Sequence, residues 1–209
     1  MKTRMSVRRP STLALMVTAL ALTLGAGGAG LGTAAASEGV TAVASEGIIA
    51  AAAKPKFQMP FLCNTKWQLN TYDSGHNPAL DIVVKGNTGS SGKWVLPGYK
   101  GTVAKTFWDR GAGNVIIIKH GGGWFTAYYH LKDKHNKYVH AGENVGPRTK
   151  IGRIGATGSN SGDWAHLHYE QRYKASGIPT EANRKPVHFN GTKYTGTGRT
   201  WTSVTSKNC

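Results

Sequence analysis

Residues 166–173 read His-Leu-His-Tyr-Glu-Gln-Arg-Tyr, and this stretch decides how the rest of the 209-residue sequence is interpreted. The segment is strand-like, and side chains two residues apart on a β-strand point to the same face. His166 and His168 would therefore project together, with Glu170 on the same face. The stretch predicts a strand that carries two imidazoles and a carboxylate in a row.

Working outward from this strand, the rest of the folded region also consists of strand patterns and turns. Residues 101–108 and 124–130 alternate in polarity, whereas residues 80–84 and 115–118 are apolar and β-branched. Segments rich in Gly, Asn, Ser and Pro separate the strands, and no window of useful length repeats every 3.6 residues. The 28 glycines suit tight turns between short strands. We therefore predict a mainly β, single domain built on an antiparallel sheet.

The first 36 residues have the order of a secretory signal peptide. Four basic residues lie within the first ten, an apolar run follows, and residues 33–37 supply an A-x-A-type cleavage site. Glycines interrupt the run and leave it shorter than the ~20 apolar residues of a membrane-spanning helix. We expect a secreted, wall-associated protein without stable membrane insertion. Residues 37–53 are of low complexity and predict a short pro-segment or leader remnant before a domain at 54–209.

The charge of the sequence constrains its partners. The whole chain carries +16, and residues 54–209, with 22 basic and 8 acidic residues, carry +14. A field of this sign attracts polyanions. No arginine-rich helix or aromatic RNA-binding strand pattern is present, so we expect anionic cell-wall polymers rather than nucleic acid. The protein is expected to be a monomer.

Only two cysteines occur, Cys63 and Cys209. In an exported chain such a pair predicts a disulfide, with two free thiols as the alternative. The bridge would tie the two ends of the domain together. The tail, residues 192–209, is rich in Thr, Lys and aromatic residues and is expected to dock on the sheet.

Histidine and aspartate recur at the ends of the predicted strands. His130 ends the strand at 124–130, while His76 and Asp81 flank a turn that Pro78 would stiffen. With the pair at 166 and 168, these residues supply the nitrogen and oxygen ligands that suit tetrahedral zinc. A catalytic zinc site needs three protein ligands, and further histidines serve to move protons. Four other histidines are interpreted as structural or solvated: His120, His135, His140 and His188.

The order of these segments resembles the lysostaphin-type, or LytM-like, metallopeptidases of family M23, which include a β-lytic type. In that family a His-x-x-x-Asp motif precedes a Gly-Asn-Val-Ile-type strand, a Tyr-x-His-Leu motif and a closing His-x-His. The resemblance covers residues 76–173. After His76 and Asp81, the matching segments are Gly113-Asn114-Val115-Ile116, Tyr128-Tyr129-His130-Leu131, residues 151–159 and His166-Leu167-His168.

The resemblance implies a LytM/lysostaphin-like catalytic fold with a zinc-floored groove, and one zinc per chain with His76, Asp81 and His168 as its ligands. It also implies that zinc-activated water attacks a peptide carbonyl, with His130 and His166 as acid–base groups and stabilisers of the oxyanion. Zinc lowers the pKa of water towards ~7, and a neutral imidazole can accept the released proton.

Two departures from the family pattern bear on the site. Four residues, rather than the common three, separate His76 from Asp81, and Asp163-Trp164-Ala165 replaces a small Gly-Pro-type segment before His166. Asp163 is an alternative ligand, and Trp164 is expected to shape a rim of the groove. Glu170 resembles the acid that commonly follows the His-x-His motif, and it is expected to orient an imidazole.

Three functions remain open on the sequence alone. The first is a zinc endopeptidase that cuts Gly- or Ala-containing stems or cross-bridges of bacterial peptidoglycan. The second is a LytM-like module that binds wall or activates an amidase without catalysis. The third is a zinc protease that acts on glycine-rich proteins. Because the chain retains every residue of the ligand and acid–base set, we favour the first.

Overall fold

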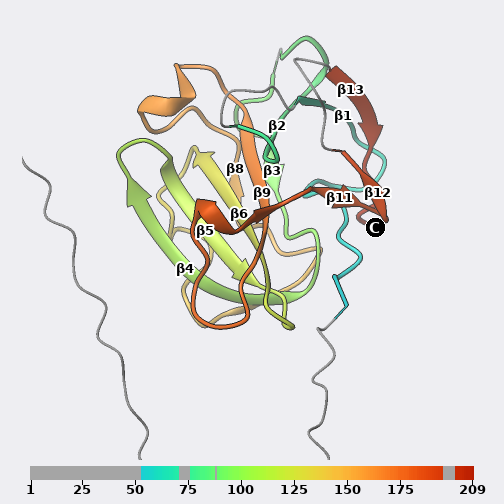
Figure 1. Cartoon of the computed structure of the whole chain (residues 1–209). Helices are drawn as coiled ribbons and strands as arrows, with labels where there is room; N and C mark the ends of the chain where they lie inside the picture. Colours follow the sequence, from blue (N-terminus) through green and yellow to red (C-terminus); the bar gives the residue numbers. More distant parts are fainter. Residues whose placement is uncertain (1–52, 71–75, 88, 195–200) are drawn as a thin grey trace, which may run out of the picture. The chain divides into compact units, whose positions relative to one another are not determined.

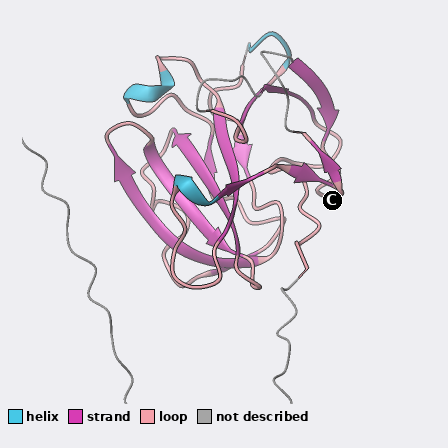
Figure 2. Cartoon of the chain, in the orientation of Figure 1, coloured by secondary structure: helices cyan, strands magenta, loops and turns pink. Residues whose placement is uncertain are grey.

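The structure, a computed structural model, describes residues 53–70, 76–87, 89–194 and 201–209. A nine-stranded sheet dominates it (Figures 1 and 2), and all of the strand pairs are antiparallel. In spatial order the strands are β13 (Trp201–Thr205), β1 (Lys66–Asn70), β2 (Leu80–Val83), β9 (Leu167–Tyr173), β6 (Trp124–Leu131), β5 (Gly113–Lys119), β4 (Gly101–Asp109) and β7 (Asn144–Val145), and β10 (Arg184–Lys185) also pairs with β9.

Two small antiparallel pairs and three short 3₁₀ helices complete the described part of the chain. The pairs are β3 (Trp94–Val95) with β8 (Gly152–Arg153), and β11 (His188–Phe189) with β12 (Thr192–Lys193). The helices are η1 (Lys85–Asn87), η2 (Ser159–Ser161) and η3 (Glu181–Asn183). The mainly β, antiparallel fold predicted from the sequence is confirmed. The proposed signal peptide at 1–36 and nearly all of the leader remnant at 37–53 lie outside the described residues.

The central strands are buried on both faces. Ile116 and Ile118 of β5 pack into the main core, and Val115 and Ile117 belong to a smaller apolar cluster on the opposite face. A strand covered on both sides reads as a continuous apolar run rather than an alternating one, which explains Val115-Ile-Ile-Ile118. On β9 only one face is apolar: Leu167 and Tyr169 enter the main core, so His168 and Glu170 face the other way.

The segment before β1 is part of this core. Met59 and Phe61 are both fully buried, and the Phe61 ring stacks on that of Trp67 with centroids 3.5 Å apart. The backbone N–H of Gln58 donates to the carbonyl of Gly98, and a Cβ added at Gly98 would collide with the Gln58 carbonyl oxygen. Glycine at residue 98 therefore permits the close approach of the two chains.

The expected disulfide between Cys63 and Cys209 is present, with Cα atoms 4.8 Å apart and a sequence separation of 146 residues. The expected docking of the tail is also observed, because β13 pairs with β1 along five residues from Lys66↔Thr205 to Asn70↔Trp201. The bridge and the edge strand together fasten both ends of the domain to the same side of the sheet. Within the described residues, no helix is long and apolar enough to span a membrane.

Phe61→Ala is expected to lower the free energy of unfolding by about 3–5 kcal/mol, since it deletes a fully buried ring and leaves a cavity. Leu62→Ala is the matched control. Leu62 is 51% exposed, so its truncation should change the free energy by no more than about 0.5 kcal/mol. Denaturant unfolding of both variants measures the difference, and equal losses would contradict the assignment of Phe61 to the core.

Candidate metal and catalytic site

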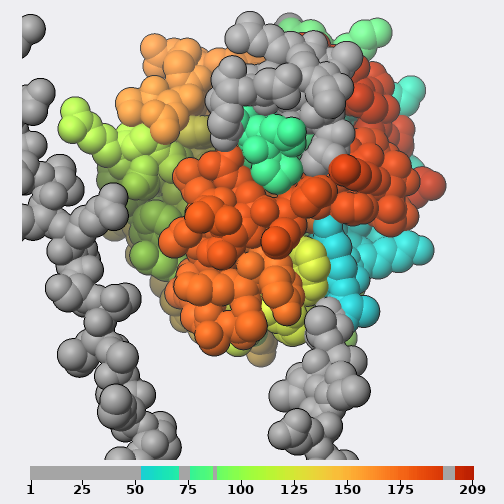
Figure 3. Space-filling view, viewed as in Figure 1, coloured from blue at the N-terminus to red at the C-terminus, as the bar shows by residue number. Residues whose placement is uncertain are grey.

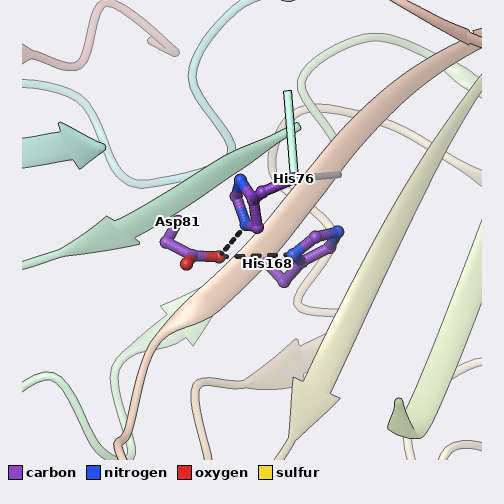
Figure 4. A group of neighbouring side chains, drawn as sticks. All are labelled: His76, Asp81 and His168. Carbon is purple, nitrogen blue, oxygen red and sulfur yellow. Dashed lines mark hydrogen bonds and ion pairs between the residues drawn. The ribbon is translucent and has the colours of Figure 1, made fainter. Parts of the chain in front are cut away.

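Two neighbouring strands and one turn bring His76, Asp81 and His168 together (Figure 4). Asp81 on β2 lies opposite His168 on β9 in the strand register. His76 precedes β2 in a turn that closes with a hydrogen bond from the N–H of Ala79 to the His76 carbonyl. Asp81 Oδ1 lies 2.9 Å from His76 Nε2 and 3.2 Å from His168 Nδ1. The four-residue spacer is thus accommodated in the turn, and both side chains still meet.

The donor atoms of these three residues fit a zinc ion. They all lie within 4.8 Å of one another, and a tetrahedral zinc with bonds of ~2.0–2.1 Å would hold its ligand atoms about 3.3 Å apart. Two nitrogens and one carboxylate oxygen also form a common donor set of catalytic zinc, which keeps its fourth position open. The residues present therefore match the group that the family pattern implies.

The surroundings of His168 also resemble those of a metal-binding imidazole. Its Nδ1 faces Asp81, and its Nε2 lies 3.0 Å from Glu170 Oε1. Burial opposes protonation of this imidazole, but the two carboxylates outweigh burial and raise the pKa of His168 to about 9, so that zinc binding would displace the Nδ1 proton. A metal-binding imidazole commonly donates its other N–H to a carboxylate, which fixes the tautomer and the ring orientation. Glu170 is placed to do this for His168.

Glu170 is itself held by a buried arginine. Arg172 Nε donates to Glu170 Oε2 at 2.6 Å, and the same guanidinium donates to the carbonyl of Pro179 at 3.0 Å and to the hydroxyl of Tyr129. Glu170 is 1% exposed and Arg172 is 2% exposed. Burial opposes ionisation, but His168 and, after it, Arg172 keep the pKa of Glu170 below its ordinary value. The carboxylate is therefore fixed on both sides and charged.

His130 and His166 face each other beside the three clustered residues, with ring centroids 4.8 Å apart. His130 Nδ1 lies 2.7 Å from the carbonyl oxygen of Thr157, and His166 Nδ1 lies 2.8 Å from that of Trp164. A carbonyl oxygen only accepts, so each Nδ1 carries the proton and each neutral ring keeps a lone pair on Nε2. Burial lowers the pKa of His130 to about 4 and also lowers that of His166. Both imidazoles are therefore unprotonated at neutral pH.

An open cleft of about 360 Å³ contains all of these groups. Its rim comes from three segments: η2 with Trp164, the turn after β4, and the segment after β9 that contains η3. In Figure 3 the orange, lime and red-orange parts of the chain, to which these three segments belong, are visible on one face of the molecule. The Trp164 ring stacks on His166 at 4.3 Å with an interplanar angle of 26°. Trp164 thus borders the cleft, as expected from the sequence.

The three implied ligands, the two acid–base histidines and Glu170 all line this one cleft. Asp163, the alternative ligand, is exposed and is not among the residues that line it. The sequence did not predict a role for Tyr129 and Arg184, which line the cleft, or for Arg172, which holds Glu170. Arg172 follows Glu170 by the same two-residue step that links His166, His168 and Glu170, so the strand pattern already contained its signal.

A comparison with known protein families assigns the sequence to one of them. The family model described as Peptidase family M23 matches residues 79–186, which is more than half of the chain. The chain belongs to peptidase family M23. The match spans β2 to β10 and so includes every residue of the cleft except His76.

One of two curated relatives of this M23 chain is named as an enzyme, and the other is named as an activator of enzymes. The chain is 37% identical over 70 residues to the peptidoglycan DD-endopeptidase ShyC of Vibrio cholerae, covering 34% of this chain and 15% of that protein. It is 33% identical over 105 residues to the murein hydrolase activator NlpD of Escherichia coli, covering 50% of this chain and 25% of that protein. The aligned segments are therefore a minor part of both relatives.

Among solved structures, a zinc-containing peptidase from Vibrio cholerae is 25% identical, with a TM-score of 0.45 over 56% of this chain and 36% of that one. By their names, both curated relatives are peptidoglycan-related proteins. They include both an enzyme and an activator of enzymes.

Proposed function

We propose that this chain is a secreted zinc metalloendopeptidase that hydrolyses peptide bonds in bacterial peptidoglycan. The observation that carries the proposal is the convergence of a three-residue donor group and two neutral imidazoles in one open cleft. A structural zinc site is closed by four protein ligands, whereas a catalytic site keeps a position for water or substrate. The described donor group has three members and opens into the cleft.

His76, Asp81 and His168 would hold the zinc ion in this mechanism. Zinc supplies Lewis acidity towards the peptide carbonyl and makes water a usable nucleophile near neutral pH. One of the two imidazoles, His130 or His166, accepts the proton of the attacking water on Nε2, because its Nδ1 proton is committed to a backbone carbonyl. The protonated imidazole then donates this proton to the departing amine. A protonated imidazole also stabilises the negative charge that develops on the oxygen of the attacked carbonyl group.

The substrate is proposed to be a Gly- or Ala-containing stem or cross-bridge. Glycine has no side chain to collide with the rim of the cleft, which Trp164 narrows on one side, and it adopts backbone angles that other residues avoid. The charge of +14 on residues 54–209 would hold the enzyme to anionic wall polymers. We propose residues 54–209 as the working domain, since the contacts of Lys54, Met59 and Phe61 belong to the folded unit.

The second candidate function is activation of another wall hydrolase without catalysis, and the similarity to NlpD favours it. The two functions differ in a simple experiment. The zinc-loaded protein alone should release peptide fragments from purified walls if it is an endopeptidase. An activator should release nothing alone and should increase the release by an added amidase.

Glu170→Gln is expected to weaken zinc binding by about 10- to 100-fold, because a neutral amide orients the His168 ring less firmly than the carboxylate does. Glu143→Gln is the matched control, since Glu143 is exposed and pairs with His140 at the surface. Competition with a fluorescent zinc chelator measures both affinities. Equal affinities in the two variants would contradict the role given to Glu170.

A further inference from the structure

A second hollow, the side recess, adjoins the catalytic cleft. It has a volume of about 320 Å³ and lies between the end of β4 and the segment that follows β9. Ala112, Tyr129 and Glu181 line both spaces. Because the cleft and the side recess share these residues, the recess lies directly beside the place where a peptide would bind.

The walls of the side recess are mainly apolar. Phe107 of β4, Ile117 of β5, Ile178 and Pro179 all line it. Ile178 is 42% exposed, which is high for a large aliphatic side chain in this structure. These surfaces favour an aliphatic group, because burying it removes apolar area from water on both partners.

Four charged residues also line the side recess, and three of them are compensated within the described residues. Asp109 accepts hydrogen bonds from the N–H groups of Gly111 and Ala112, both at 2.8 Å. Arg172 pairs with Glu170, and Glu181 lies 3.0 Å from Arg184.

Lys105 is the exception. Its Nζ lies 4.4 Å from the centre of the Phe107 ring, which holds the cation over a wall of the recess. Among the residues that the structure describes, no carboxylate lies within ion-pair distance of it. A cation above an apolar wall suits a ligand that is aliphatic along its length and anionic at its end.

We propose that the side recess is a specificity subsite for an aliphatic side chain that ends in a carboxylate. That side chain belongs to the peptide whose bond is cut in the cleft, so the inference rests on the proposed function. The aliphatic part lies against Phe107 and Ile178, and the carboxylate pairs with Lys105. The subsite selects substrate and takes no part in bond cleavage.

The test uses synthetic peptides with a central Ala-Gly bond and, at each of the three positions on either side in turn, glutamate or its neutral isostere glutamine. At one of these positions the wild-type protein is expected to cut the glutamate peptide with a kcat/KM about fivefold higher, the size of a good exposed ion pair. Lys105→Gln should remove this preference without slowing the glutamine peptide. Lys105→Glu should reverse it, and high salt should weaken it in the wild type.

Lys193→Gln is the control, because Lys193 is an exposed residue of the separate β11–β12 pair and its loss changes the net charge equally. It should keep the preference. The proposal is overturned if no position distinguishes glutamate from glutamine, or if Lys105→Gln retains the distinction. If wild-type protein cuts neither peptide, their dissociation constants are compared instead. A glutamate preference in binding that Lys105→Gln removes would then support the subsite and reject the endopeptidase, whereas equal binding would reject both.

Discussion

Wild-type protein is expected to hold one zinc per chain, and His168→Ala is expected to lose it while the sheet remains folded. A zinc ion needs three protein ligands here, and His168 Nδ1 and His76 Nε2 each approach the same oxygen of Asp81. Removal of either imidazole leaves two ligands, too few to retain the ion through purification. His76→Ala should therefore behave in the same way.

Elemental analysis of the purified variants measures this effect, with circular dichroism as the check on folding. His140→Ala is the control, because this imidazole is exposed and pairs with Glu143 away from the cleft. It should keep one zinc per chain. Full zinc content in folded His168→Ala and His76→Ala would refute the ligand assignment.

His130→Ala and His166→Ala are expected to keep zinc and fold but to lose at least about 100-fold in kcat, as is typical when a general acid or base is removed. Neither residue belongs to the donor group, and each is fixed through Nδ1 so that Nε2 remains for proton transfer. Steady-state kinetics on a soluble peptide measures the loss. His135→Ala, which alters a residue outside the cleft, should retain wild-type turnover.

A near wild-type kcat in either cleft variant would remove that histidine from the mechanism. A loss confined to KM would instead assign it to binding, because an interaction made equally in the bound substrate and in the transition state changes KM alone. Measuring kcat and KM separately thus distinguishes a histidine that transfers protons from one that only contacts the bound substrate.

The sequence predicted the long central strands well and the short strands poorly. Segments such as 101–108 and 124–130 show a two-residue period, and they became β4 and β6 with small shifts at their ends. The two-residue strands β3 and β8 have too few residues to show any period. They form because each finds a partner in space, as Trp94 does opposite Arg153.

The site was predictable to the extent that its residues lie in local motifs. His166, His168 and Glu170 share a strand face, which spacing alone reveals. The contact of Arg172 with Tyr129 was not predictable in this way, because it joins β9 to β6 and depends on the register in which Tyr129 lies opposite His168. Register follows from the pairing of whole strands and the turns between them.

The side recess could not be predicted from the sequence either. Lys105, Phe107 and Asp109 occupy alternate positions of β4, which predicts a shared face. Ile178 and Pro179, however, which also line the recess, lie about 70 residues further along the chain. Only the fold brings these two segments together.

Product analysis of digested peptidoglycan tests the central claim most directly. Purified walls are incubated with the zinc-loaded protein alone, and new amino groups, new reducing ends and fragment masses are measured as the suspension clears. The account predicts new amino termini beside Gly or Ala, no reducing sugar, and complete inhibition by a zinc chelator. Reducing ends that rise in step with clearing, or intact walls that are degraded only when an amidase is added, would contradict it.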